Sequence, residues 1–335
     1  MDSLSQLALG ASIGVAVMGR RTALWKAAVW GGIAGTLPDL DVFIDYGNDL
    51  ANMVNHRGES HSLFYLTLFS PALAALAWRI HARAHFQHWW LMMWLVLITH
   101  VLLDASTVYG TRLGLPFTNH AFGTGSVFII DPLYTLPLLL GLVWALFGRA
   151  EHAGRANAIG LAVSTLYLGW SLVAQAHVTQ LARQSMPAGV PADARVLVTP
   201  SPFNTILWRV VIHDGKQYHE GFYSLLDAQA RIRFTTHVAG REIGARLPEN
   251  SPAASLQHFA GGFVKFSHDQ GMLRIADLRM GQEPNYHFDF VLARDLPDGT
   301  LQPVVPQRVG ERGDPRAGLR WVWQRLLGQD LPPPA

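Results

Sequence analysis

The chain has 335 residues, of which 26 are Lys or Arg, 24 are Asp or Glu, and none is Cys. Half of the residues are hydrophobic and only 15% are charged, against about 25% in an average soluble domain, so much of the chain is expected to lie out of water. The absence of Cys excludes thiol nucleophiles, disulfides and Cys-ligated zinc. The nearly balanced charge of +2 argues against a nucleic-acid partner. Any metal site must therefore use His and carboxylate ligands.

Apolar segments fill roughly the first 180 residues and predict an α-helical transmembrane bundle of about five to six helices. A membrane-spanning helix needs about 20 mainly apolar residues, and four segments reach or approach that length: 62–78, 89–103, 127–147 and 158–176. Two earlier segments, 4–18 and 22–37, are shorter and rich in glycine, which favours two helices packed closely as a hairpin. No basic region precedes the first of them, which argues against a signal peptide.

The distribution of Lys and Arg between the segments predicts the orientation of the bundle. If all six segments cross, one face carries seven basic residues and one acid, Glu151, whereas the other carries Arg57 and Arg112 with most of the acids. The seven are Arg20, Arg21, Lys26, Arg79, Arg83, Arg149 and Arg155. By the positive-inside rule the first face is cytoplasmic. The loops 39–61 and 104–131 and the C-terminal domain are then expected on the non-cytoplasmic side of a multi-pass membrane protein.

The residues after position 194 alternate between polar and apolar as in a water-soluble domain. Residues 181–194 are expected to be a linker, 195–305 a small β-rich extramembrane domain, and 306–335 a Pro-rich, partly disordered tail. Strand-like alternation marks 203–213, 216–223, 263–268, 273–280 and 286–293, and Asp214-Gly215 predicts a hairpin turn between the first two. Residues 228–234 fit either a short helix or a strand. Residues 321–327 fit a short amphipathic helix, either on the membrane surface or on the domain.

Ionisable side chains lie at the ends of the apolar segments, where burial makes them costly and a functional role is the first hypothesis. With six crossings, all of them fall on the same face of the membrane. They are Asp39, Asp41, His56, His61, His100, Asp104 and Asp131. His100 and Asp104 are four residues apart, so both point to the same side of one helix. The set therefore predicts a metal site at one depth.

The types of these side chains restrict the chemistry of such a site. Imidazole and carboxylate ligands without thiolates suit zinc, manganese or iron, and we expect zinc as the usual ion of hydrolysis. A catalytic zinc keeps one position open for water and lowers the pKa of that water toward about 7. Three His and four Asp exceed the needs of one ion, so either two ions share them or some Asp residues orient the His ligands. Arg57 is expected to bind an anionic group of the substrate, and Glu59 to act as general base.

Four short motifs follow one another along roughly the first 150 residues. They are Gly35-Thr-Leu-Pro-Asp-Leu-Asp41, His56-Arg-Gly-Glu-Ser-His-Ser62, His100-Val-Leu-Leu-Asp104 and Asp131-Pro132, of which the second is the most specific. In this order they resemble the YdjM-like family of inner-membrane proteins, described as metal-dependent hydrolases. The resemblance implies an inner-membrane location, hydrolase activity and a set of metal-site residues. That set is Asp39, Asp41, His56, His61, His100 and Asp104, with Asp131 as a further candidate.

Each of these residues also has a structural explanation. Asp41 and Asp131 are placed to cap helices, the second of them directly before a proline at the first helical position. His56 and His61 are compatible with hydrogen bonding at the membrane interface. His100 and Asp104 are compatible with a polar pair that fixes helix packing. The residues are therefore informative as a set rather than singly.

Together these features predict a membrane-embedded, metal-dependent hydrolase in which a metal-bound hydroxide attacks an ester or phosphoester. Membrane lipids are the expected partners, and a lipid or lipid-linked molecule the expected substrate. The main alternative is a metal-ion or proton transporter, because intramembrane Asp and His residues also mark ion paths. A third interpretation is a membrane scaffold whose polar cluster is structural and whose β domain is the active part.

Overall fold

The chain forms two compact units in the computed structural model, which describes residues 1–81, 83–310 and 313–334. We call the first the helical unit; it comprises Met1–Ile44, Arg57–Leu172 and Pro202–Asn204. The second, the β-rich unit, comprises Asp45–His56, Val173–Ser201 and Thr205–Ala335. A short segment from the motif-bearing half of the sequence, residues 45–56, therefore belongs to the β-rich unit.

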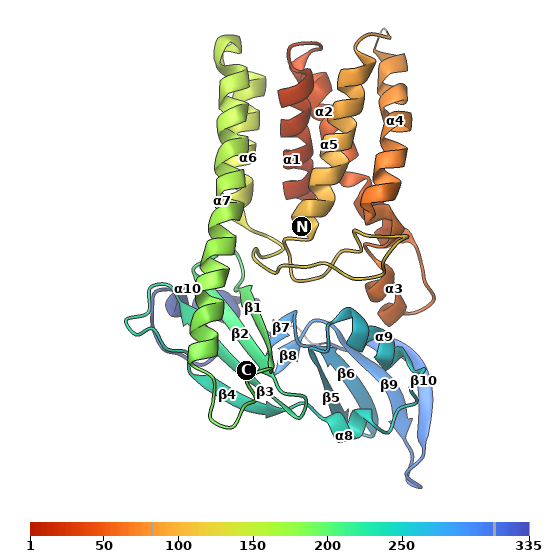
Figure 1. The fold of residues 1–335 in the computed structure, drawn as a ribbon, viewed down its shortest axis with the longest axis vertical. Helices are drawn as coiled ribbons and strands as arrows, with labels where there is room; N and C mark the ends of the chain where they lie inside the picture. Colours follow the sequence, from red (N-terminus) through yellow and green to blue (C-terminus); the bar gives the residue numbers. More distant parts are fainter. Residues whose placement is uncertain (82, 311–312, 335) are drawn as a thin grey trace. The chain divides into compact units, whose positions relative to one another are not determined.

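Apolar helices make up the helical unit. They are Ser3–Met18 (α1), Leu24–Thr36 (α2), Leu63–Ile80 (α4), Phe86–Asp104 (α5), Pro132–Phe147 (α6) and the first part of Ala150–Gln184 (α7) (Figure 1). Two 3-10 helices, Pro38–Phe43 (η1) and Glu59–His61 (η2), follow α2 and precede α4. Among the described residues, α4, α5 and α7 are long and apolar enough to cross a membrane, and α1 and α6 are shorter apolar helices. The predicted helical N-terminal region with apolar spans is confirmed.

Several helices begin where the sequence provides a capping side chain. Asp2 accepts hydrogen bonds from the backbone N–H groups of Leu4 and Ser5 at the start of α1. Ser62 caps α4, and Asp131 caps α6 with Pro132 at the first helical position. The structural explanation of Asp131 is thus confirmed.

The helices α1 and α2 pack backbone to backbone as the expected hairpin. A Cβ added at Gly31 would lie 2.1 Å from the carbonyl oxygen of Gly10, and one added at Gly10 would lie 2.3 Å from that of Gly31. Only glycine permits such an approach, which is typical of helix pairs in membranes. Met18 of this hairpin and Trp89 and Leu97 of α5 have fully buried side chains in the apolar core of the unit.

Consecutive helices of the helical unit run in opposite directions. Figure 1 shows the α1–α2, α4–α5 and α6–α7 connections at one end of this unit, and the N-terminus with the chain that follows α5 at the other. The end of α2, the start of α4 and the end of α5 therefore come together at the second end. Three of the four motifs lie at these places in the sequence, and the fourth, Asp131-Pro132, lies at the start of α6.

Two four-stranded antiparallel sheets form most of the β-rich unit. The first has the order β1-β2-β3-β4 and contains Arg195–Pro200 (β1), Leu207–His213 (β2), Gln217–Ser224 (β3) and Phe234–Val238 (β4). The second has the order β10-β9-β6-β5 and contains Val264–Asp269 (β5), Met272–Asp277 (β6), Asp289–Asp295 (β9) and Leu301–Arg308 (β10). The short strands Gly281–Gln282 (β7) and Asn285–Tyr286 (β8) pair with each other. The helices Asp49–Asn55 (α3), Arg241–Gly244 (α8), Pro252–Phe259 (α9) and Pro315–Leu326 (α10) complete the unit.

The structure tests several local expectations in this unit. The predicted hairpin is confirmed, because His213 pairs with Tyr218 and the Asp214 carboxylate accepts from the backbone of the intervening turn. The expectation of an element over 228–234 was wrong, since strand β4 begins only at Phe234. The amphipathic helix is longer than expected and begins at Pro315. Its Trp321 is buried with Leu207 of the β-rich unit. Of the two predicted positions for this helix, the membrane surface or the domain, Trp321 therefore supports the domain.

Candidate metal centre

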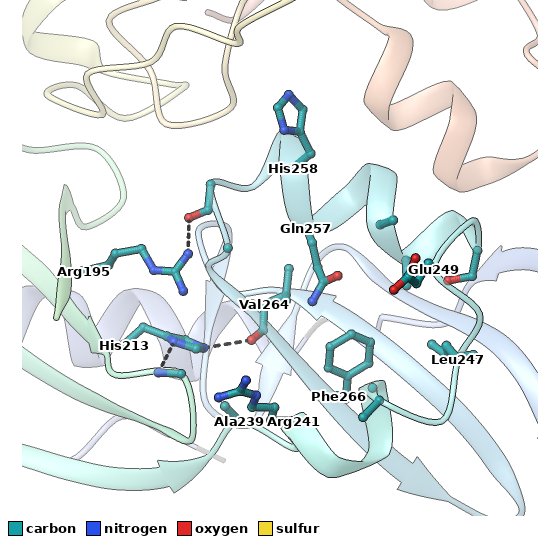
Figure 2. A pocket seen from close by; sticks show the side chains of 18 of the residues that line it. Arg195, His213, Ala239, Arg241, Leu247, Glu249, Gln257, His258, Val264 and Phe266 are labelled. Atoms are coloured by element: carbon teal, nitrogen blue, oxygen red, sulfur yellow. Dashed lines mark hydrogen bonds between the residues drawn. The ribbon is translucent and has the colours of Figure 1, made fainter.

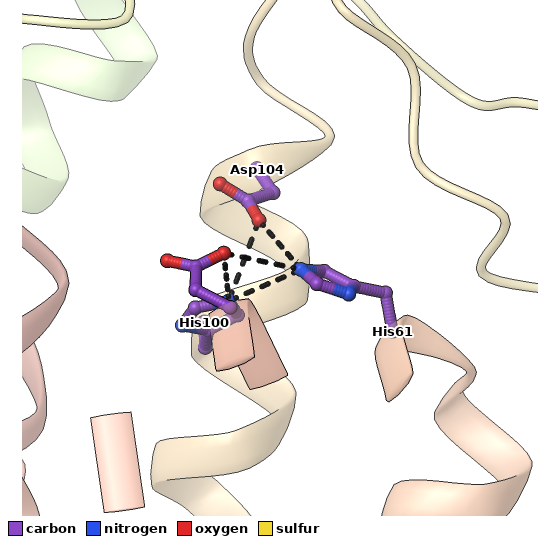
Figure 3. A group of neighbouring side chains, drawn as sticks. His61, His100 and Asp104 are labelled. Atoms are coloured by element: carbon purple, nitrogen blue, oxygen red, sulfur yellow. Dashed lines mark hydrogen bonds and ion pairs between the residues drawn. The ribbon is translucent and has the colours of Figure 1, made fainter. Parts of the chain in front are cut away.

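Four of the predicted ligands meet at the end of the helical unit where α2 and α5 end and α4 begins. Asp39 comes from η1, His61 from η2, and His100 and Asp104 from the last turns of α5. One ligand atom from each lies within 4.8 Å of the others. Figure 3 shows the two imidazole rings and the Asp104 carboxylate directed toward a common centre.

The distances between these ligand atoms match the edges of a metal-sized tetrahedron. His61 Nε2 lies 3.4 Å from His100 Nε2, 3.4 Å from Asp39 Oδ1 and 3.2 Å from Asp104 Oδ2. His100 Nε2 lies 3.5 Å from Asp39 Oδ1 and 3.4 Å from Asp104 Oδ2. A tetrahedral zinc with ligands at about 2.0–2.2 Å has ligand–ligand edges of about 3.3–3.6 Å. The two-His, two-Asp set therefore fits one such ion.

Hydrogen bonds behind both rings direct Nε2 toward the centre. His100 Nδ1 donates to the carbonyl oxygen of Gly35 at 2.7 Å. His61 Nδ1 lies 2.9 Å from Ser60 Oγ, which in turn donates to the Asp41 carboxylate at 2.6 Å. A proton held on Nδ1 leaves the Nε2 lone pair for a metal, the usual arrangement of ligating histidines. Asp41 is thus an orienting residue for His61 in this geometry.

The carboxylate of Asp104 divides its two oxygens between the protein and the centre. Oδ1 lies 3.1 Å from the Arg57 guanidinium, accepts from Gln6 Nε2 at 3.1 Å and contacts the amino group of Met1. Oδ2 is buried and lies 3.2 Å from His61 Nε2 and 3.4 Å from His100 Nε2. A buried carboxylate oxygen directed at two imidazoles is what a metal ligand requires.

Arg57 is buried beneath the cluster rather than exposed beside it. Its guanidinium contacts Asp104, donates to Thr107 Oγ1 at 3.2 Å and lies 5.0 Å from the ring centroid of Tyr109. Its backbone has φ of +61° and its N–H donates to Asp41 at 2.9 Å. A non-glycine residue held in the left-handed region indicates a turn fixed by its surroundings. In this geometry Arg57 positions Asp104.

The two cluster residues that lie outside the candidate spans have shifted pKa values. Burial acts to raise the pKa of Asp39, but hydrogen bonds from the imidazoles outweigh it and lower this pKa well below its usual range. Burial acts to lower the pKa of His61, but the surrounding carboxylates outweigh it and raise this pKa to about 9. In the metal-free protein His61 is therefore protonated at neutral pH, and a metal ion must displace that proton.

The remaining predicted residues lie outside the group of four. Asp41 is bound behind His61, and Asp131 caps α6 and accepts from Tyr167 Oη at 2.8 Å. His56 ends the segment that belongs to the β-rich unit. Glu59 is exposed, two residues before His61.

Two further residues contribute to the centre without having been predicted. Gln6 of α1 is buried and donates to Asp104 Oδ1 and to the His100 carbonyl oxygen, both at 3.1 Å. Ser60 connects Asp41 to His61. Both are uncharged, and a search for ionisable residues in apolar segments passes over them. The signal for Gln6 is a lone amide within an apolar helix.

A cavity of about 950 Å3 lies in the β-rich unit and is lined by both polar and apolar residues. Figure 2 shows His213 in its wall, where Nε2 donates to the Val264 carbonyl oxygen and Nδ1 accepts from the Gly215 N–H, both at 3.1 Å. Burial is the main cause that lowers the pKa of His213. Because both ring nitrogens are occupied, His213 connects β2 to β5 instead of offering a ligand.

Comparison with known proteins places the helical part of the chain in a described family. The family model described as YdjM inner membrane protein matches residues 1–178. The chain is also 24% identical over 304 residues to the uncharacterized protein YfhP of Bacillus subtilis (strain 168), a match that covers 86% of this chain and 89% of that protein. No solved structure matches the chain.

Proposed function

The chain belongs to the YdjM inner membrane protein family, and from that premise we propose that it is a membrane-embedded hydrolase that acts with one divalent metal ion, zinc by preference. Asp39, His61, His100 and Asp104 would hold the ion. Its substrate would be an ester or phosphoester. The observation that carries the proposal is the spacing of the four ligand atoms, 3.2–3.5 Å across the five measured edges.

The donor set supports zinc, manganese or iron over calcium and magnesium. Two imidazoles suit the first group, whereas the second prefers oxygen ligands alone. When bound, such an ion lowers the pKa of water and polarises the bond to be cleaved. Among the ligand residues Asp39 is the more accessible, with 22% of its side chain exposed against 0% for His61 and Asp104. Substrate and water would therefore approach from the side of Asp39.

The surrounding residues have distinct parts in the proposed reaction. Arg57 and Gln6 hold Asp104, and Asp41 with Ser60 holds His61. Glu59, which is exposed and lies two residues before His61, would accept the proton that attacking water releases. Hydrolysis then adds this water across the ester bond, and the leaving alcohol takes up a proton. No redox partner is required.

The packing of α5 favours hydrolysis over transport. Ahead of His100 its inward side chains are Trp89, Met92, Met93 and Val96, each at most 1% exposed. Apolar side chains packed in this way provide an ion with neither ligands nor water. The packing of the described residues therefore leaves the site accessible from one end of the helical unit.

The proposal is tested by elemental analysis of the full-length chain purified in detergent. We expect about one equivalent of zinc, manganese or iron in the wild type, and loss of it in His61→Ala and in His100→Ala. His56→Ala is the matched control, because this nearby His lies outside the group of four and the variant should keep its metal. The loaded wild type should hydrolyse a member of an ester and phosphoester panel, and a chelator should abolish this activity.

Two results would overturn the proposal. Protein that stays metal-free after reconstitution with all three ions would reduce the cluster to a packing element. A metal-loaded protein with no hydrolytic activity across the panel would leave a metal site without the proposed reaction.

A further inference from the structure

A groove of about 480 Å3 lies beside the four ligands in the helical unit. This volume falls within the about 300–1,000 Å3 that is usual for small-molecule sites. The residues that line it include Leu37, Pro38, Ser60, Tyr65, Phe69 and Leu97. They come from the end of α2, from η1 and η2, and from the facing sides of α4 and α5.

Three of the residues that line the groove lie close in the chain to ligands of the candidate metal centre. Pro38 directly precedes Asp39, and Ser60 Oγ lies 2.9 Å from His61 Nδ1. Leu97 lies one helical turn before His100 on α5. The groove is therefore close to the accessible ligand Asp39 and to the buried ligands His61 and His100. Glu59 and Ser60 are polar residues of its lining.

The other walls of the groove are apolar and belong to helices that qualify as membrane spans. Tyr65 and Phe69 project from α4 with 38% and 50% of their surface exposed, and neighbouring Leu68 is 62% exposed. Large apolar side chains exposed on a spanning helix face hydrocarbon rather than water. The groove therefore opens sideways toward the lipid.

We propose that this groove holds the hydrocarbon chain of a membrane lipid whose anionic headgroup lies at the metal centre. This inference rests on the proposed function for its chemistry, and it names the substrate class as a lipid ester or phosphoester that enters laterally. Because lipid tails are as apolar as the groove, transfer of the chain alone gains little free energy. Binding is then selective through the headgroup at the centre and through the shape of the groove.

The test uses the full-length, zinc-loaded chain in phosphatidylcholine nanodiscs that contain a small fraction of phosphatidic acid with a diazirine in one acyl chain. After illumination, peptide mapping should find the label concentrated at residues 37–38, 60–69 and around 97. Excess phosphatidic acid without the diazirine should prevent this labelling by competition.

Phe69→Trp, which adds bulk to the groove, should lower labelling at least about fivefold, equivalent to about 1 kcal/mol. Leu68→Trp is the matched control, and its labelling should stay near that of the wild type, because Leu68 points outward from the same helix.

Label spread evenly over the outer face of α4, and unchanged by competitor or by Phe69→Trp, would overturn the inference. Metal content measured on the same samples separates this failure from that of the proposed function. A loaded centre with an unlabelled groove would refute the lipid substrate alone. A labelled groove in protein that binds no metal would support the lipid site and refute the metal-dependent reaction.

Discussion

Asp41 lies behind His61, on the side of the imidazole that faces away from the other three ligands. Its carboxylate accepts from Ser60 Oγ at 2.6 Å and from the Arg57 N–H at 2.9 Å, and lies 3.4 Å from His61 Nδ1. One side chain thus fixes both the ring of a ligand and the strained turn that brings Arg57 beneath Asp104. We infer that Asp41 acts on the metal through His61.

Replacing Asp41 with Asn should weaken metal binding without abolishing it. The amide keeps the shape of the side chain but removes the negative charge behind His61, and loss of such a partner typically costs about 10–100-fold in metal affinity. Competition with a chelator of known affinity measures the change. The control is Asp131→Asn, which removes a carboxylate that is buried to a similar degree as that of Asp41 but caps α6. The metal affinity of this variant should match that of the wild type. Equal affinity in Asp41→Asn and wild type would remove Asp41 from the centre.

The raised pKa of His61 predicts that metal affinity increases with pH. In the metal-free protein this pKa is about 9, against about 6.5 in an unfolded chain, so protonated His61 stabilises the fold below pH 6.5 and loses this contribution as pH rises through 9. Metal binding expels the proton, so affinity should rise about tenfold per pH unit up to about pH 9 and then level off. Calorimetry in buffers of different ionisation enthalpy should count about one proton released at pH 7.5. Affinity that is independent of pH between 7 and 9 would contradict this assignment.

The contact between α1 and α2 is the element on which the position of Asp39 depends, because Asp39 follows directly from the end of α2. Gly35 at that end also provides the carbonyl oxygen that orients His100. A Cβ at Gly31, one turn earlier, would lie 2.1 Å from a backbone atom of α1, which cannot rotate away. The glycine contact therefore supports the centre as well as the hairpin.

Gly31→Ala should destabilise the protein and lower its metal content together. Forcing the two backbones apart is an overpacking change that typically costs about 1–3 kcal/mol, and we expect it to displace η1. Gly169→Ala in α7 is the control, because a Cβ there meets nothing within 4 Å and gains helix propensity. Thermal unfolding in detergent with parallel metal analysis compares the two. A Gly31→Ala variant as stable as Gly169→Ala would show that the close contact is dispensable.

Features of the helices could be predicted from the sequence where one local pattern determines them. They could not be predicted where residues far apart in the chain determine them. Hydropathy and glycine spacing predicted α1, α2, α4 and α5, and the four-residue interval predicted that His100 and Asp104 act together. The exclusion of His56 from the group of four could not be predicted, because only four residues separate it from His61 and nothing in that interval marks the change of unit.

Strand β10 shows the same limit in the β-rich unit. Its last residues, 306–308, fall in the segment that the sequence alone predicts to be a Pro-rich, partly disordered tail. The strand lies at the edge of its sheet, where proline leaves no ladder hydrogen bond unmade. Edge position follows from the order of strands in the sheet, which no local pattern contains.

At the scale of the whole molecule, the arrangement of charge predicts an orientation in the membrane. The connections α1–α2, α4–α5 and α6–α7 lie at one end of the helical unit (Figure 1), and the basic residues Arg20, Arg83 and Arg149 lie in or beside them. The candidate metal centre lies at the opposite end. By the positive-inside rule we expect the connections to face the cytoplasm and the centre to face away from it.

A chain without Cys allows this orientation to be tested with single-Cys variants. Phe117→Cys lies in the segment between α5 and α6, Val305→Cys in the β-rich unit and Glu151→Cys at the start of α7; all three positions are exposed. A membrane-impermeant maleimide should label the first two in intact spheroplasts and the third only after permeabilisation. The reverse pattern would contradict the charge rule.

The same variants test whether both α6 and α7 cross the membrane. Label on Phe117→Cys but not on Val305→Cys would show that only one of them crosses, because two crossings return the chain to the side from which it started. Since α6 has only 16 residues, the comparison of these two positions decides whether it spans the membrane.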